Sequence, residues 1–334
     1  MKKLYIGIII TLVNLVLSFV IIYFVRQETN QFKKERTEIA RLLNFNDRML
    51  DVKESIPLFG AWVWEKKKKR FEHEVYLANK AYETAKKYVW WLLIVNLVFG
   101  IIVFVLYYKN HKWFAWTLVL ISFAAVGLTG GVFTPMLELE AFKEDLSVKI
   151  EIDAKEMMGD IQETVEKVPF VGETLEKYIE DLLPQLPNEK YVWQKVFPGK
   201  MYFFYENKGI FDVLRTLWKT SNEPIAIIIG VFSFVIPTLK LFFTYIMLFL
   251  PTMKAHALKK WVAYLTKFSM VDVVVIALFI TYFTFDELSH GIQTSSNALM
   301  GVYFFCVYVI FAILSGFTLE RWMDQQMKKA NAEE

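Results

Sequence analysis

The stretch PIAIIIGVFSFVIPTLKLFFTYIMLFL, residues 224–250, decides the class of fold, because it is apolar throughout except for one charged residue, Lys240. A helix needs about 20 apolar residues to cross a hydrocarbon core of about 30 Å, so this stretch predicts a membrane-spanning helix. A second apolar run at residues 268–285 carries Asp272 one turn after its start. Only a short basic segment separates the two runs, so we expect their helices to be neighbours.

Polar residues recur on one face of each of these two predicted helices. They are, at spacings of four, three and four, Ser233, Pro237, Lys240 and Thr244, and, three residues apart in the second run, Ser269 and Asp272. A charge at membrane depth costs at least about 2.5 kcal/mol, so it usually faces the interior of a helix bundle. The pattern predicts a polar path for substrate or protons; the alternatives are a structural Lys240–Asp272 ion pair and an Asp272 that only caps its helix.

Three stretches in this region share a distinctive order: KGIFDVLRTLWKTSNEPIAIIIG at 208–230, FSFVIPTLKLFF at 232–243 and KFSMVDVVVIALF at 267–279. With this serine-proline-lysine helix followed by an SMVDV helix, the sequence resembles the membrane domain of the paraquat-inducible protein A family over residues 113–320. The resemblance implies a multi-pass protein of the bacterial inner membrane. It also implies an MCE-domain protein as partner, of the kind that carries lipids between the inner and outer membranes.

The chain departs from that family in two respects. Members commonly carry two membrane domains, each preceded by a cysteine-rich zinc module, whereas this chain has one serine-proline-lysine helix and a single cysteine, Cys306. One cysteine and four scattered histidines do not make a tetrahedral zinc site. We therefore expect a single membrane domain with no metal or other cofactor.

Composition restricts the class of protein further. Hydrophobic residues make up 55% of the chain and the mean hydropathy is +0.33, which is typical of a polytopic membrane protein. The net charge of +3 is small and no base-reading motif accompanies it, so we expect no nucleic-acid partner. The sequence contains no phosphate-binding loop, nucleophile elbow, zinc-protease motif or dinucleotide fingerprint, so we expect no enzyme activity.

The first part of the chain predicts an anchored helical hairpin. The apolar run at residues 4–25 is longer than the core of a signal peptide, about 7 to 15 residues, so we interpret it as an uncleaved anchor. Residues 26–87 are charged helix formers, and a break at residues 55–60 predicts two antiparallel helices. Their contact seam is predicted at Phe71, Val75, Ala78, Tyr82, Ala85 and Val89, with Ile39, Leu42 and Met49 opposite. The hairpin is either a spacer or a partner-binding element.

Six membrane spans are predicted in all. They lie at residues 4–25, 88–108, 113–135, 224–250, 268–285 and 298–318, with a tight loop at residues 109–112. The third span ends in GLTGGVFTP, where Gly127, Gly130 and Gly131 predict close packing of another helix. The alternative interpretation of these glycines is a gap through which lipid passes.

A second long segment, residues 136–223, predicts a small α+β cap. Alternation at residues 148–152 indicates a strand, and VWQKVF and MYFFYE on either side of Pro198, Gly199 and Lys200 predict a β-hairpin. Amphipathic helices are expected at residues 154–167 and 172–183, and a short helix at 208–219.

These elements together predict a mainly α polytopic membrane protein with three parts. Residues 1–112 form two spans that carry the hairpin of residues 26–87, residues 113–320 form a four-helix membrane domain with the 136–223 insertion, and residues 321–334 form a tail. Short basic loops belong in the cytoplasm, which places both termini inside and both long segments outside. The predicted function is an inner-membrane component that passes lipid between the bilayer and an MCE-type carrier, with Lys240 and Asp272 as a proton-sensitive switch. The alternative is a sensor or assembly scaffold.

Overall fold

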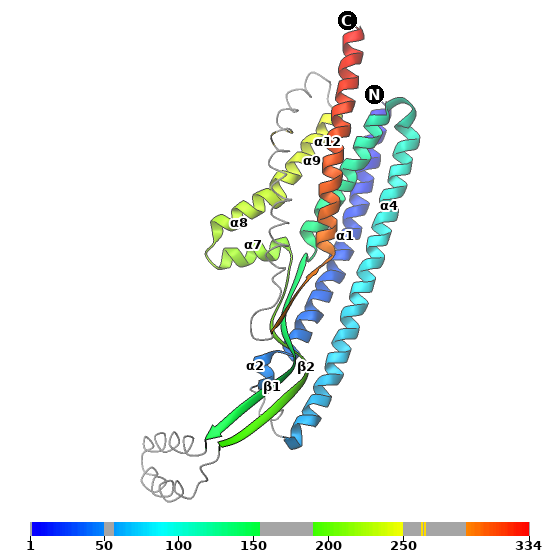
Figure 1. Cartoon of the computed structure of the whole chain (residues 1–334). Coiled ribbons are helices and arrows are strands. Elements are labelled where there is room, and N and C mark those ends of the chain that lie inside the picture. Colours follow the sequence, from blue (N-terminus) through cyan, green and yellow to red (C-terminus); the bar gives the residue numbers. More distant parts are fainter. Residues whose placement is uncertain are drawn as a thin grey trace, which may run out of the picture.

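The fold of the chain was obtained as a computed structural model, which describes residues 2–49, 57–153, 190–249, 262, 264 and 292–333. It shows a polytopic helical membrane protein with a small α+β part, as the sequence predicted, and the β part is a three-stranded sheet (Figure 1). In chain order the elements are α1 Lys2–Leu42, α2 Phe45–Met49, α4 Pro57–Phe133, β1 Leu137–Asp153, β2 Lys190–Lys208, α7 Ile210–Lys219, α8 Glu223–Gly230, the π-helical turn η2 Val231–Val235, α9 Ile236–Phe249, β3 Gln293–Ala298 and α12 Met300–Glu333.

Five helices of the described part are long and apolar enough to cross a membrane. They are Ile6–Leu42, Lys67–Lys109, His111–Phe133, Glu223–Phe249 and Met300–Lys328, which contain five of the six predicted spans apart from one or two residues at their ends. The predicted span at residues 268–285 lies outside the described residues, as do Ser269, Asp272 and the amphipathic helices expected at 154–167 and 172–183.

The first two spans continue without a break into a long antiparallel helix pair. Helix α1 has 41 residues, about 60 Å at 1.5 Å per residue, and lies along the first part of α4 (Figure 1). On the predicted seam Ala78 and Ala85 are fully buried, and Val25 of α1 packs against Ala85. Small residues at the centre of the seam bring the two helices close together.

The chain reverses direction sharply within α4, where a tight loop was predicted. His111 leaves the helical region at φ −144° and ψ 59°, and residues 111–133 then run back as the third span. The N-terminus, this turn and the C-terminus lie at one end of the molecule, and the sheet lies toward the other (Figure 1).

The glycines of the third span confirm the close-packing interpretation. A Cβ atom on Gly127 would stand 2.6 Å from the backbone nitrogen of Tyr308 in α12, and one on Gly130 would stand 2.6 Å from the ring of Phe304. Contacts this short leave no room for a side chain at these two positions. Helix α12 therefore packs directly on the backbone of α4. Lipid therefore does not pass between these two helices at the glycines.

The predicted hairpin at Pro198, Gly199 and Lys200 is wrong, because these residues belong to one continuous strand. Strand β2 pairs with β1 along its whole length, and the register slips where Glu144 faces Lys200 but Leu146 faces Phe197. Two residues of β2 thus oppose Asp145, whose Oδ1 accepts a hydrogen bond of 2.9 Å from the Gly199 amide. Gly199 has φ +78°, the conformation that a β-bulge takes where an extra residue enters, and β2 is an edge strand that tolerates proline.

The third strand of the sheet was not predicted. Strand β3, QTSSNA, pairs with residues 137–142 of β1, so the sheet order is β2-β1-β3. It immediately precedes α12 and brings the end of the chain back to the segment after the third span. A polar sequence without apolar alternation carries no strand signal of its own, and the free edge of β1 supplies the pairing.

A buried ion cluster fastens the sheet to α1. Arg36 donates through Nε to Glu138 Oε1 at 2.8 Å and through Nη2 to Glu140 Oε1 at 2.5 Å. The same Glu138 oxygen accepts a bond of 2.7 Å from the hydroxyl of Tyr205. Burial raises the pKa of Glu140 above its ordinary value, although the Arg36 guanidinium acts against this shift. Arg36 and Glu138 together therefore join three elements, α1, β1 and β2.

A second ion pair joins α1 to α7, one turn before Arg36. Lys33 Nζ lies 2.6 Å from Asp212 Oδ2, and the same carboxylate accepts the Gly209 amide at 3.0 Å. Burial alone would raise the pKa of Asp212, but these two donors and the charge of Lys208 bring its pKa below the ordinary value. The short helix α7, predicted from residues 208–219, is thereby held against the N-terminal helix.

Candidate functional site

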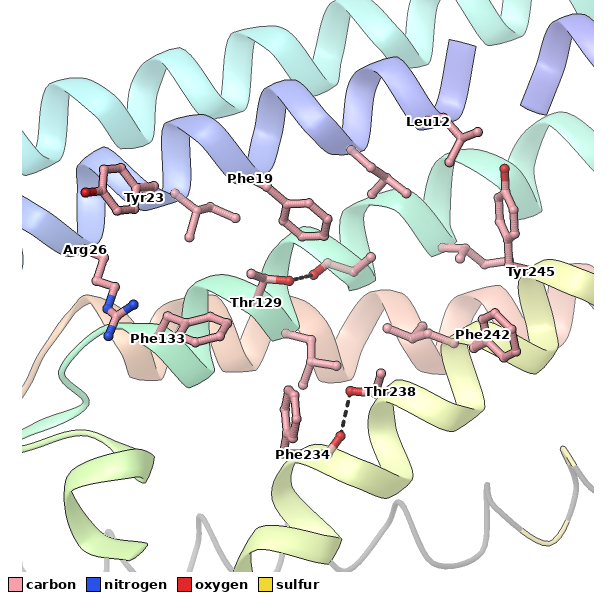
Figure 2. A pocket seen from close by; sticks show the side chains of 16 residues that line it. Leu12, Phe19, Tyr23, Arg26, Thr129, Phe133, Phe234, Thr238, Phe242 and Tyr245 are labelled. Atoms are coloured by element: carbon pink, nitrogen blue, oxygen red, sulfur yellow. Dashed lines mark hydrogen bonds between the residues drawn. The ribbon is translucent and has the colours of Figure 1, made fainter. Parts of the chain in front are cut away.

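An apolar groove runs between the first, third and fourth spans. Its volume is about 690 Å³, within the range of about 300 to 1,000 Å³ that is common for ligand sites. Helix α1, the second part of α4, and the η2–α9 segment each form one wall (Figure 2). The lining residues are Leu12, Leu15, Phe19, Ile22, Tyr23, Arg26, Ile121, Ala125, Leu128, Thr129, Phe133, Phe234, Thr238, Leu241, Phe242 and Tyr245.

Each wall is a stripe of residues with helical spacing. On α1 the stripe runs 12, 15, 19, 22, 23 and 26, and on α9 it runs 234, 238, 241, 242 and 245. Residues three and four apart lie on one face of a helix. The residues of each stripe therefore form a continuous surface along their helix. The hydroxyls of Thr129 and Thr238 are bonded to carbonyls of their own helices, at 2.8 and 2.7 Å, which leaves the surface of the groove apolar.

The two ends of the groove differ in polarity. Arg26 is the only charged residue among the sixteen that line it, and its guanidinium carbon lies 5.3 Å from the centre of the Phe133 ring. Tyr23 lies at the same end, while Leu12 and Tyr245 lie at the other (Figure 2). Arg26 follows the apolar run of residues 4–25 directly, so this end stands at the level where hydrocarbon meets water.

Aromatic rings connect the charged end of the groove to α7. The rings of Phe133 and Phe211 are 5.4 Å apart, and those of Phe211 and Phe234 are 6.1 Å apart. Phe234 belongs to η2, where the Ile236 amide donates to the Val231 carbonyl, five residues back instead of four. Pro237 has no amide hydrogen for the carbonyl four residues before it, and the wider turn accommodates this loss.

The polar face predicted on the fourth span is buried beside the groove and does not line it. Ser233, Pro237, Lys240 and Thr244 are all buried, and the Thr244 hydroxyl donates to the Lys240 carbonyl at 2.7 Å. The lining residues Phe234, Thr238, Leu241 and Tyr245 each follow one of these four directly. Movement of one face of this helix therefore moves the other. Ser269 and Asp272 lie outside the described residues.

A further set of buried polar residues joins the first two spans. Asn14 Nδ2 donates to Asn96 Oδ1 at 3.1 Å, and Asn96 Nδ2 donates to Ser18 Oγ at 3.1 Å. Amides buried between membrane helices hydrogen-bond across the interface because no water competes for them. Sequence reasoning missed this set, although Asn14 and Asn96 are polar residues within apolar runs and carried the signal.

Comparison with known proteins bears on the second half of the chain. Residues 200–326 match the family model described as paraquat-inducible protein A. The chain contains a paraquat-inducible protein A domain. No curated protein and no solved structure matches the chain.

The groove lies between the paraquat-inducible protein A domain and the helices that precede it. The domain supplies the wall of η2 and α9, whereas α1 and α4, including Arg26 and Phe133, lie before residue 200. Sequence reasoning placed the candidate site on the polar face within the domain. It missed the groove because the three walls come from segments far apart in the sequence, two of which lie before the matched residues 200–326.

Proposed function

We propose that this protein is an inner-membrane component of an intermembrane lipid-transport system and passes lipid between the bilayer and an MCE-domain carrier. The groove carries the proposal. Its apolar lining extends along α1 from Leu12 to Arg26, about 21 Å at 1.5 Å per residue, and it ends at a cation. A lipid has the same division, with an apolar chain that ends in a polar group.

The arrangement of charged ends supports a definite orientation. The turn at residues 109–112 holds two lysines and a histidine, and the N-terminal segment begins with Lys2 and Lys3. Short basic segments remain in the cytoplasm, so the proposal places both termini there. The sheet and the α1–α4 hairpin then stand on the extracytoplasmic side, where a carrier protein would dock.

Filling the groove tests the proposal. Ala125→Trp places a large ring in the wall formed by α4, so we expect phospholipid bound to the wild-type protein to be lost from the variant. Native mass spectrometry of the detergent-purified protein measures the lipid adducts directly. Thr238→Trp fills the groove from the α9 wall. With two such variants, a folding defect of one does not decide the result.

The matched control adds the same bulk outside the groove. Ile310→Trp lies on the exposed face of α12 and should retain as much lipid as the wild type. Equal lipid retention by Ala125→Trp, Thr238→Trp and Ile310→Trp would refute the groove as a lipid site. The sensor or scaffold function would then take its place.

Coupling to protons is the energy source that we propose, because Lys240 is buried on the helix whose next face lines the groove. The double variant Lys240→Met, Asp272→Asn removes both charges. In proteoliposomes, its lipid transfer should no longer depend on an imposed pH gradient. Lys219→Met, which removes one exposed charge, should leave that dependence intact. Transfer by the double variant that still follows the pH gradient would exclude proton coupling through these two residues.

A further inference from the structure

We propose that Arg26 binds the phosphate of a glycerophospholipid whose acyl chain lies in the groove. The inference rests on the proposed function and adds to it the class of lipid and the residue that selects it. Arg26 lies before the matched domain and in none of the polar faces considered from the sequence.

Arg26 differs in its contacts from Lys33 and Arg36, which follow it on the same helix. Lys33 pairs with Asp212 and Arg36 pairs with Glu138 and Glu140, all within 2.8 Å. Arg26 is exposed, and within the described ranges no carboxylate lies at ion-pair distance from it. A cation at the mouth of an apolar groove attracts an anionic ligand.

The geometry around Arg26 suits a phosphate. Its guanidinium carbon lies over the Phe133 ring, 5.3 Å from the ring centre, and this cation–π contact holds the guanidinium at the end of the groove. A guanidinium presents its N–H groups as a fork that matches two phosphate oxygens. Tyr23 lies at the same end of the groove and adds a hydroxyl that can donate to the phosphate or to an ester oxygen (Figure 2).

The position along the helix agrees with the dimensions of one leaflet. Arg26 stands at the end of the apolar run, and Leu12 lies near its middle. Half of a hydrocarbon core is about 15 Å and the groove is about 21 Å long, enough for an acyl chain below a head group at the interface. The chain of a bound phospholipid would point from Arg26 toward Tyr245.

Binding of two lipids, of which only one carries a phosphate, tests the inference. Phosphatidylglycerol and a diacylglycerol with the same chains are titrated onto the delipidated full-length protein, and their affinities are measured by native mass spectrometry. In Arg26→Gln we expect the affinity for phosphatidylglycerol to fall about tenfold or more and that for diacylglycerol to stay unchanged. Arg26→Lys keeps the charge but loses the forked guanidinium, so its affinity for phosphatidylglycerol should lie between those of the wild type and Arg26→Gln. Lys34→Gln removes an exposed charge of the same helix and should bind phosphatidylglycerol as the wild type does.

Three outcomes would overturn the inference. An unchanged ratio of the two affinities in Arg26→Gln would show that Arg26 does not hold the phosphate. Inorganic phosphate that competes as strongly as phosphatidylglycerol would make this a site for the free anion. If Ala125→Trp weakens the binding of neither lipid, the groove is not a lipid site and the proposed function is refuted as well. If Ala125→Trp loses both lipids while the ratio of affinities is unchanged in Arg26→Gln, only the role of Arg26 is refuted.

Discussion

Replacing Arg36 with leucine should lower the free energy of opening of the sheet by about 3 to 5 kcal/mol, which is the cost of breaking a buried ion pair. Glu138 and Glu140 are almost fully buried, and Arg36 is the cation that both of them contact. In the variant, the carboxylates of Glu138 and Glu140 stay buried and each loses the hydrogen bond that Arg36 donated. Hydrogen exchange of the β1 amides in detergent micelles measures the change.

The same substitution should make the sheet more stable as the pH falls. Burial already raises the pKa of Glu140, and Arg36 counteracts that effect, so its removal raises this pKa further. A carboxyl whose pKa is higher in the folded than in the unfolded state binds extra protons on folding. Stability therefore increases as the pH falls through the raised pKa, and the slope should be steeper in Arg36→Leu than in the wild type.

Two controls separate the buried cluster from ordinary surface pairing. Arg41→Leu removes an exposed arginine that contacts Glu38 at 3.3 Å, and its effect should stay below about 0.5 kcal/mol. Replacing Arg36, Glu138 and Glu140 together by leucine should regain most of the stability, since no buried charge remains. Equal effects of Arg36→Leu and Arg41→Leu would show that the cluster does not hold the sheet.

Gly127→Ala should destabilise the helix bundle by about 1 to 3 kcal/mol, the usual cost of overpacking. The added methyl would stand 2.6 Å from the Tyr308 nitrogen and 2.8 Å from the Phe304 carbonyl oxygen, both of which are backbone atoms of α12. Backbone cannot rotate away as a side chain can, so the two helices must separate. The midpoint of thermal unfolding in detergent should fall accordingly.

Gly316→Ala is the matched control, with the opposite sign. Nothing lies within 4 Å of a Cβ atom at this position of α12, and alanine in a helix interior is favoured over glycine by about 0.5 to 1 kcal/mol. We therefore expect a small rise in the midpoint. A rise for Gly127→Ala as well would mean that α4 and α12 do not touch at this point, and would restore the interpretation of the glycines as a gap for lipid.

The sequence was a good guide wherever a single helix carries the signal. Apolar length predicted the spans of the described part, and spacings of four, three and four placed Ser233, Pro237, Lys240 and Thr244 on a face that the structure buries. The glycines after Val126 predicted close packing of another helix, which the structure identifies as α12. These features depend on hydrophobicity and helical period, which are local properties of the chain.

Features that join distant segments were mostly missed. Pro198 and Gly199 suit a turn between two strands as well as a bulge within one, and only the continuous partner strand β1 decides in favour of the bulge. Strand β3 has no apolar pattern and forms because β1 offers it a free edge. Arg26 was counted only as the first residue of the charged hairpin segment, since its neighbour Phe133 lies more than a hundred residues away.

What the sequence by itself determined is a polytopic helical membrane protein, the positions of the five spans within the described residues and the buried polar face of the fourth span. Tertiary structure alone decided that α1, α4 and α9 turn their apolar stripes toward one another, and that Arg26 stands at the mouth of the groove between them. The physical reason is that each stripe is equally apolar toward lipid and toward protein. Hydrophobicity therefore places a helix in the membrane, but only close packing at residues such as Gly127 and specific ties such as Lys33–Asp212 select which helices face each other.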